Sequence, residues 1–148
     1  MSKRVLLVDG NWNLKRNYHQ QMPKLDSNKE NCNGTYGFLI SLQVAITKSI
    51  PDRVVVFWDG FHSGKLRYDI YKPYKANRQK HWENESEALR LELNNQDEEG
   101  RKKFELLIQK IKTMNFLVDL WIRQLEMDHI EADDLIAQYI IDNPEEVI

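Results

Sequence analysis

Two short runs of apolar, β-branched-rich residues place the strongest constraint on how this chain can fold. The first run, Arg4–Val8, ends at an Asp-Gly pair, and the second, Arg53–Trp58, ends at another Asp-Gly pair. Continuous apolar runs of this length are typical of strands buried on both faces, as in a parallel sheet. The sequence therefore predicts two neighbouring parallel strands whose carboxyl ends each carry an aspartate and a glycine.

The remaining segments fit helices and a third strand around such a sheet. Apolar residues at helical spacing predict a helix over Thr35–Ser49. Residues Glu83–Lys112 read as one long polar helix or as two helices broken near Gly100, Asn115–Ile122 as a third strand, and Glu131–Ile141 as a last helix. The alternation of strands and helices predicts an α/β fold with a parallel central sheet flanked by helices.

Composition limits the class of protein. The chain has 148 residues, a formal net charge of −2, 41% hydrophobic and 30% charged residues, which is typical of one globular domain. One cysteine excludes an intrachain disulfide framework and a zinc site built from several cysteines. No apolar run reaches the roughly 18 residues of a membrane span. We expect a single domain over residues 1–148, with a cytoplasmic location as the default.

Periodicity also predicts which side chains are buried. In the second half of the chain, an apolar stripe at helical spacing is expected to dock on the rest of the fold, and it comprises Phe104, Leu107, Ile108, Ile111 and Met114. The last predicted helix has an apolar face made of Leu135, Ile136, Tyr139 and Ile140. Of the four tryptophans, Trp58 and Trp121 are expected in the core.

Five acidic residues are predicted to gather at one edge of the sheet. Asp9 and Asp59 end the two strands, and Glu131, Asp133 and Asp134 lie at the start of the last predicted helix. Each group can also be explained without a functional role, because Asp-Gly is a common turn and acidic residues favour helix N-termini. Together they form a set of oxygen ligands, which favours Mg²⁺ or Mn²⁺ over zinc.

Charge is strongly segregated along the middle of the chain. Residues 65–80 contain six Lys or Arg and one acid, whereas residues 83–99 contain seven acids and one Arg. In the basic block, lysines and arginines alternate with tyrosines, which suits contacts with phosphates and bases. The alternative is a solvated face whose tyrosines pack on the core.

Three segments resemble the 5′-nuclease family, which includes phage and bacterial 5′→3′ exonucleases, the 5′-nuclease domain of bacterial DNA polymerase I, and flap endonucleases. Residues 5–11 (VLLVDGN) resemble its first acidic motif. Residues 57–60 (FWDG), followed by residues 71–78 (YKPYKANR), resemble its second. Residues 131–134 (EADD) resemble its third. The order and spacing of the motifs agree over the whole chain.

This resemblance implies roles for individual residues. It makes metal ligands of the five acids, Asp9, Asp59, Glu131, Asp133 and Asp134. It makes Lys75 and Arg78 catalytic candidates that contact the scissile phosphate, and it implies nucleic-acid contacts for Arg16, Arg67, Lys72, Lys75 and Arg78. The fold implied is PIN-like, and residues 80–112 would form the family's helical arch, an insertion over the site. Arg101, Lys102 and Lys103 would lie nearer to DNA than the acidic residues 83–99.

The implied activity is that of a Mg²⁺-dependent (or Mn²⁺-dependent) 5′→3′ exonuclease or flap endonuclease. Its partner would be DNA with a 5′ end or flap, in replication, repair or phage genome metabolism, in the host cytoplasm if phage-encoded. The family continues past the last helix into a further strand with more aspartates and a helix–turn–helix element, which this sequence lacks. We therefore expect a fragment, a reduced relative, or a domain completed by a second chain. The alternatives are a PIN-like endoribonuclease and a nucleic-acid-binding or accessory subunit without catalysis.

Overall fold

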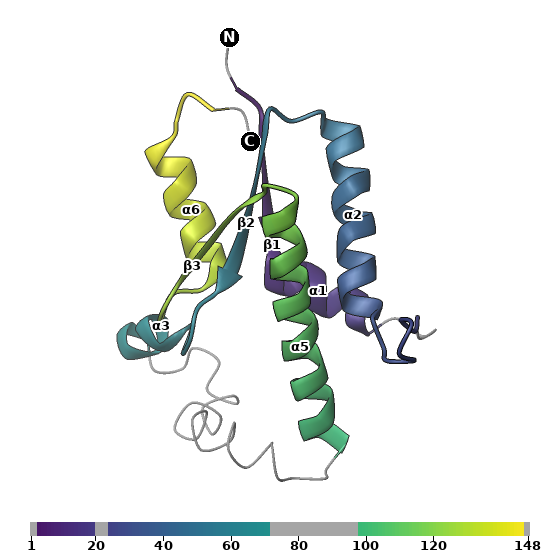
Figure 1. Ribbon diagram of the computed structural model, residues 1–148. Helices are drawn as coiled ribbons and strands as arrows, with labels where there is room; N and C mark the ends of the chain where they lie inside the picture. The colour runs from purple at the N-terminus through teal and green to yellow at the C-terminus, as the bar shows by residue number, and fades with distance from the viewer. Residues whose placement is uncertain (1–2, 20–23, 72–97, 147–148) are drawn as a thin grey trace.

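The computed structural model describes residues 3–19, 24–71 and 98–146 of the chain. Within them the chain forms three strands and five helices, shown in Figure 1. The elements in chain order are β1 (Val5–Asp9), α1 (Gly10–Tyr18), α2 (Asn33–Ser49), β2 (Arg53–Asp59), α3 (Lys65–Ile70), α5 (Glu98–Asp119), β3 (Arg123–Met127) and α6 (Ala132–Asp142). None of the described helices is long and apolar enough to cross a membrane.

The predicted parallel sheet is confirmed, with strand order β1–β2–β3. Asp9 lies opposite Phe57, and Asp59 lies opposite Met127, so the two aspartates are offset by two residues at the same end of the sheet. Figure 1 shows that this end lies away from both chain termini, on the side where α3 lies. The carboxyl end of the sheet is thus the edge that the sequence predicts to carry function.

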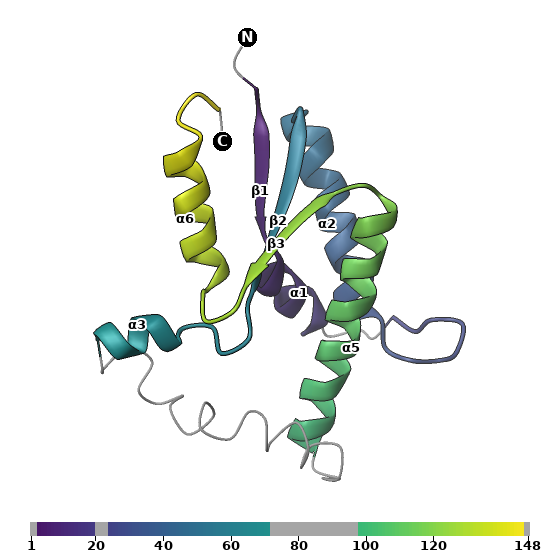
Figure 2. The ribbon, with the colours of Figure 1, turned by 60° about the vertical axis from the view of Figure 1, so that its left-hand side comes forward.

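The sheet separates two helical layers, as both ribbon views show (Figures 1 and 2). Side chains alternate along β2, because successive residues of a strand point to opposite faces. Val56 and Trp58 pack with residues of α1, α2 and α5, whereas Val55 and Phe57 pack with α6. All four are fully buried, so the central strand is covered on both faces, as its apolar sequence requires.

Helix α1 directly follows β1, and the apolar pattern did not predict it. The Asp9 side chain caps it by accepting a hydrogen bond from the Trp12 amide at 2.9 Å. Its buried face is half polar, consisting of Asn13, Leu14, Asn17 and Tyr18. The asparagines are paired, since Asn17 Nδ2 donates to Asn13 Oδ1 at 2.9 Å. A helix that buries paired amides lacks the apolar periodicity by which helices are predicted.

Two predictions for α5 and β3 were wrong. The expected strand Asn115–Ile122 is the end of α5 and the turn after it, and the third strand is Arg123–Met127. The face of α5 that docks contains Gln109, Thr113 and Leu117, all buried. Within the expected stripe, Met114 and Ile108 are partly buried, whereas Phe104, Leu107 and Ile111 are exposed.

The buried polar residues of α5 explain this difference. Gln109 Oε1 accepts from the Thr35 amide at 3.1 Å, and Gln109 Nε2 donates to the Asn31 carbonyl at 2.9 Å. Thr113 Oγ1 donates to the Gln109 carbonyl at 2.7 Å and lies 3.1 Å from Thr35 Oγ1. Because these groups have partners, their burial costs little, and the helix turns a partly polar face to the core.

Two smaller expectations also need correction. Trp58 is buried as expected, but Trp121 is 96% exposed, in the turn between α5 and β3. On α6, Leu135, Ile136 and Tyr139 pack against the sheet as expected, whereas Ile140 is exposed. Trp121 has a positive φ of 58° in this turn.

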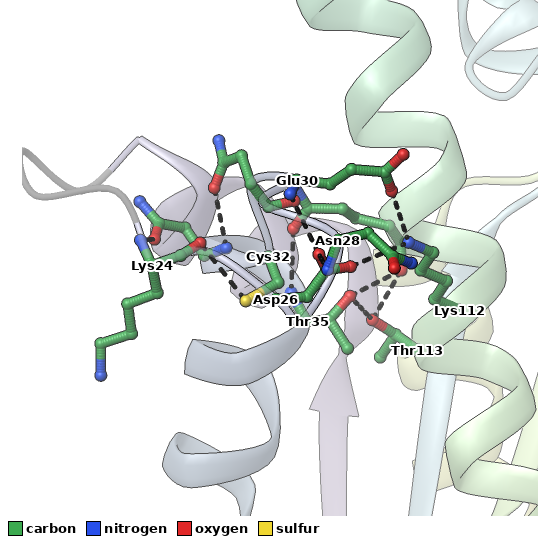
Figure 3. Close-up of polar contacts among 11 residues, drawn as sticks. Lys24, Asp26, Asn28, Glu30, Cys32, Thr35, Lys112 and Thr113 are labelled. Atoms are coloured by element: carbon green, nitrogen blue, oxygen red, sulfur yellow. Dashed lines mark hydrogen bonds and ion pairs between the residues drawn. The ribbon is translucent and has the colours of Figure 1, made fainter.

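The loop before α2 is fastened to α5, as Figure 3 shows. The Asp26 carboxylate accepts hydrogen bonds from the Asn28 and Glu30 amides at 2.8 and 3.0 Å. Lys112 of α5 reaches both acids, at 3.7 Å from Asp26 and 3.3 Å from Glu30. Cys32 Sγ donates to the Lys24 carbonyl. This loop therefore ties the first helices to α5.

Candidate functional site

Asp9 stands at the junction of β1 and α1, half-buried between the sheet and the helix. Burial raises the pKa of its carboxyl, and the negative charges of Asp59 and Asp133 raise it further. The Trp12 amide and the positive charge of Lys15 act in the opposite direction. Asp9, Asp59 and Asp133 therefore lie within electrostatic reach of one another, although they are separated by up to 124 positions in sequence (133 − 9).

Asp59 joins three elements at the carboxyl end of β2. Its Oδ1 accepts from the amide of Ala132, the first residue of α6, at 2.9 Å. Its own amide donates to Asn11 Oδ1 of α1 at 3.2 Å. Lys110 Nζ of α5 donates to its carbonyl at 3.2 Å. The strand end, the acidic helix and the first helix are thus held together through one residue.

Glu131 and Asp134 are held by an arginine. Arg67 of α3 places Nη1 at 2.7 Å from Glu131 Oε2 and Nη2 at 2.5 Å from Asp134 Oδ1. Its Nε donates to Asp134 Oδ2 at 2.9 Å, so the guanidinium contacts Asp134 through two nitrogens. The side chain of Glu131 is only 10% exposed, so this positive charge offsets the cost of burying its carboxylate.

The two Asp-Gly pairs owe their glycines to close packing. A Cβ atom on Gly10 would lie 2.6 Å from the buried Trp58 ring, and one on Gly60 would lie 1.8 Å from the Met127 carbonyl oxygen. Neither Gly10 nor Gly60 has a positive φ. The absence of a Cβ therefore lets the start of α1 pack against Trp58 of β2 and lets the end of β2 pack against the end of β3.

The structure brings the predicted acids to one end of the sheet, but not into a ready coordination sphere. Within residues 3–19, 24–71 and 98–146, no three His, Cys, Asp or Glu side chains are grouped closely enough to hold a metal ion. Glu131 and Asp134 face Arg67, whereas Asp9 and Asp59 accept hydrogen bonds from backbone amides. The donor chemistry is all oxygen, which fits a hard divalent cation.

The predicted basic residues divide into two groups. Lys72, Lys75 and Arg78 lie outside the described residues, as do residues 80–97 of the expected arch. Residues 98–112 form the first part of α5, where Lys102 and Lys103 pair with Glu98 and Glu99 on an exposed surface. Arg16 lies on α1, with its guanidinium carbon 5.1 Å from the centre of the Trp12 ring.

Sequence reasoning missed two residues that shape this site. Asn11 positions the Asp59 amide, and Lys110 brings a positive charge to the end of β2, 2.9 Å from Glu126 and 5.5 Å from the Trp58 ring centre. Asn11 directly follows the first Asp-Gly pair, which was a usable signal. Lys110 gave none, because it stands in a helix rich in charged residues.

Comparison with known proteins gives the same assignment for the chain. The family model described as "5'-3' exonuclease, N-terminal resolvase-like domain" matches residues 4–147. A search of curated protein sequences gave no match.

Solved structures from bacteriophage T5 share the fold. A flap endonuclease in a pseudo-enzyme–product complex with DNA and metal ions aligns with a TM-score of 0.62 at 15% identity, over 96% of this chain and 45% of that chain. A 5′-exonuclease with bound zinc aligns at 0.64 and 17% identity, over 95% and 45%. The chain thus spans less than half the length of these proteins. Since the family model covers nearly all of this sequence, the chain belongs to the 5′–3′ exonuclease family and carries its N-terminal, resolvase-like domain.

Proposed function

We propose that this chain is a metal-dependent nuclease domain that hydrolyses phosphodiester bonds of DNA, as a 5′→3′ exonuclease or flap endonuclease. One observation carries the proposal. Asp9, Asp59 and Asp133, from β1, β2 and α6, lie at the carboxyl end of the sheet, within the distance at which the charges of the other two raise the pKa of Asp9. A fold gains nothing from gathering like charges at one edge, whereas a bound cation would stabilise them.

The residues that would hold the metal are Asp9, Asp59 and Asp133, joined by Glu131 and Asp134. Their oxygen donors suit Mg²⁺ or Mn²⁺, which bind phosphates and a few carboxylates while keeping several waters. When bound, such an ion supplies an activated water and stabilises negative charge on a phosphate. The T5 structures that share the fold contain metal ions, which supports a divalent cofactor.

The chain's own cations would act around these acids. Arg67 holds Glu131 and Asp134 in place, as its ion pairs indicate. Lys75 and Arg78 are proposed to contact the scissile phosphate, and Lys72 the neighbouring backbone, on the strength of the motif alone. Each of these three cations would offset negative charge that develops on the phosphate during cleavage.

DNA with a 5′ end or flap is the proposed substrate. Support comes from the family assignment and from the T5 flap endonuclease, whose complex contains DNA. The basic residues of α1 and of residues 65–80 supply the local positive charge that a nucleic acid needs, although the chain as a whole has a net charge of −2.

A matched pair of substitutions on α6 tests the metal site. Asp133→Asn removes a proposed ligand, whereas Asp142→Asn makes the same change at the other end of the helix, where Asp142 accepts from Gln138. Cleavage of labelled 5′-flap DNA is measured in Mg²⁺, in Mn²⁺ and in EDTA. We expect Asp133→Asn to reduce the rate by roughly a hundredfold or more, because a ligand supports several kcal/mol of charge stabilisation. Asp142→Asn should leave it unchanged.

A substrate panel separates the alternatives. Preferential cleavage of single-stranded RNA would replace the proposal with an endoribonuclease. Absence of cleavage by the parent chain in both metals would overturn the nuclease proposal. Equal turnover by Asp133→Asn and the parent would remove Asp133 from the site.

A further inference from the structure

We propose that the exposed face of α1 binds single-stranded nucleic acid, with Trp12 as a base-stacking residue. This face, here called the α1 stripe, consists of Trp12, Lys15 and Arg16 of the helix and of His19, which directly follows it. The inference rests on the proposed function, because it assigns the path by which a nucleic-acid strand would approach the proposed metal ligands Asp9, Asp59 and Asp133, here called the acidic cluster. It adds a role for Trp12, to which none of the sequence motifs assigns a function.

The stripe follows from the helical period. Positions 12, 15, 16 and 19 are exposed, whereas positions 13, 14, 17 and 18 are buried against the core. Residues at i, i+3, i+4 and i+7 share one face of a helix, so the four side chains form a continuous row. Helix α1 contains no acidic residue. The row thus presents one aromatic ring and a run of nitrogen-bearing side chains.

Trp12 has the properties of a stacking residue. Its side chain is 58% exposed, so the ring is accessible to a ligand. The Arg16 guanidinium lies over its ring, with the carbon 5.1 Å from the ring centre. Nucleobases stack on aromatic rings and on guanidinium planes alike, so the pair forms a platform that tolerates any base.

The row begins at the acidic cluster. The Trp12 amide donates to Asp9 Oδ1 at 2.9 Å, which places the tryptophan within one turn of a proposed metal ligand. The charge of Lys15 acts on the same carboxyl, because it lowers the pKa of Asp9 against the effect of burial. A strand stacked on Trp12 would therefore carry its phosphates past Lys15 and Arg16, close to the acids.

Trp121 provides a matched control. It is 96% exposed, lies in the turn that precedes β3, and so stands at the end of the sheet opposite Asp9. If exposed tryptophan alone favoured nucleic acid, both tryptophans would contribute equally to binding.

Binding is measured by fluorescence anisotropy of a labelled single-stranded oligonucleotide in EDTA, so that no cleavage occurs. We expect Trp12→Ala to weaken binding by roughly tenfold or more, since this is the usual effect of removing one stacking aromatic. Trp12→Phe should retain most of the affinity, and Trp121→Ala should match the parent. Lys15→Gln and Arg16→Gln should each lower the salt dependence, log Kd against log salt, by about 0.7. Far-UV circular dichroism confirms that each variant is folded.

The outcomes separate this inference from the proposed function. Tight binding that depends on Trp12, without cleavage in Mg²⁺ or Mn²⁺, supports the α1 stripe and overturns the nuclease. Cleavage by the parent with equal binding by Trp12→Ala and the parent overturns the stripe alone. Equal weakening by Trp12→Ala and Trp121→Ala also overturns it, because the effect would not be specific to α1.

Discussion

At the scale of single residues, the candidate site is a balance between gathered negative charge and the cations around it. Asp9 carries a raised pKa because it is half-buried near Asp59 and Asp133. Glu131 and Asp134, only a few positions from Asp133, are instead neutralised by Arg67. Within this group of acids, Glu131 and Asp134 thus have Arg67 as a counter-charge, whereas the acidic neighbours of Asp9 raise its pKa.

The guanidinium of Arg67 can be tested by removing it. Arg67→Gln takes the positive charge from the nearly buried Glu131 carboxylate, so we expect it to destabilise the fold by about 1–3 kcal/mol; a fully buried pair would lose more, but Arg67 is partly exposed. Urea unfolding measures the loss, and Lys102→Gln, which breaks an exposed pair with Glu98, is the control. Equal stability of Arg67→Gln and the parent would show that the ion pairs are not structural.

At the scale of elements, burial in α5 follows hydrogen bonding as well as apolar character. Some polar side chains of this helix are buried because they have hydrogen-bond partners, and some apolar side chains are exposed. Gln109 is buried and bonded to the loop and the N-terminus of α2, whereas Ile111, two positions on, is 47% exposed.

The burial of Gln109 and the exposure of Ile111 lead to a prediction for α5. Gln109→Ala leaves the buried Thr35 amide without its acceptor, so we expect a loss of about 1–3 kcal/mol in the free energy of unfolding. Ile111→Ala removes an exposed side chain, so its effect should stay within about 0.5 kcal/mol. Chemical denaturation of both variants measures the difference. A larger effect at Ile111 than at Gln109 would contradict the packing of α5.

The loop fastened to α5 adds a dependence on pH. Hydrogen bonds from the Glu30 and Asn28 amides, together with Lys112, lower the pKa of Asp26. Because the folded state favours the ionised carboxyl, this stabilisation is present above the unfolded pKa of about 3.9 and is lost as the pH falls through the folded value.

Asp26→Asn tests this linkage, because it keeps an oxygen acceptor and removes the charge. We expect the variant to be less stable than the parent near pH 7, and the difference to shrink in acid below the usual range for Asp. Thermal or urea unfolding across pH measures the two curves. A difference that did not change with pH would show that the Asp26 charge does not stabilise the loop.

At the scale of the whole molecule, stability and proposed function oppose each other at Asp9. Burial and the neighbouring acids raise its pKa, so its ionised form is a cost to the fold near neutral pH. Asp9→Asn removes this cost and keeps an oxygen that can cap α1 at the Trp12 amide.

We therefore expect Asp9→Asn to melt at a higher temperature than the parent in EDTA, while losing any cleavage activity. Added Mg²⁺ should raise the melting temperature of the parent more than that of the variant, because binding to the native state stabilises it. Differential scanning calorimetry in EDTA and in Mg²⁺ gives both comparisons. A variant that melts below the parent in EDTA would contradict the electrostatic account of the site.

The sequence by itself determined the first two strands of the sheet and the set of acids, whereas the third strand was misplaced. The apolar runs Arg4–Val8 and Arg53–Trp58 predicted buried strands. The strand ends, the helix of residues 131–141 and the family motifs followed from local pattern. Residues that are close together in the sequence determine these features, so periodicity and spacing are enough to predict them.

Only the tertiary structure decided which cations meet the acids and which faces are buried. Arg67 faces Glu131 across 64 positions, Lys110 reaches Asp59 across 51 (110 − 59), and Gln109 takes a core position because distant groups bond it. Helix α1, with Trp12 on its exposed side, follows from a cap and paired amides and not from an apolar stripe. The physical reason is the same in each case. A buried polar group is stable only beside a hydrogen-bonding or oppositely charged partner, and these partners are far away in the sequence, so only the tertiary structure shows which groups meet.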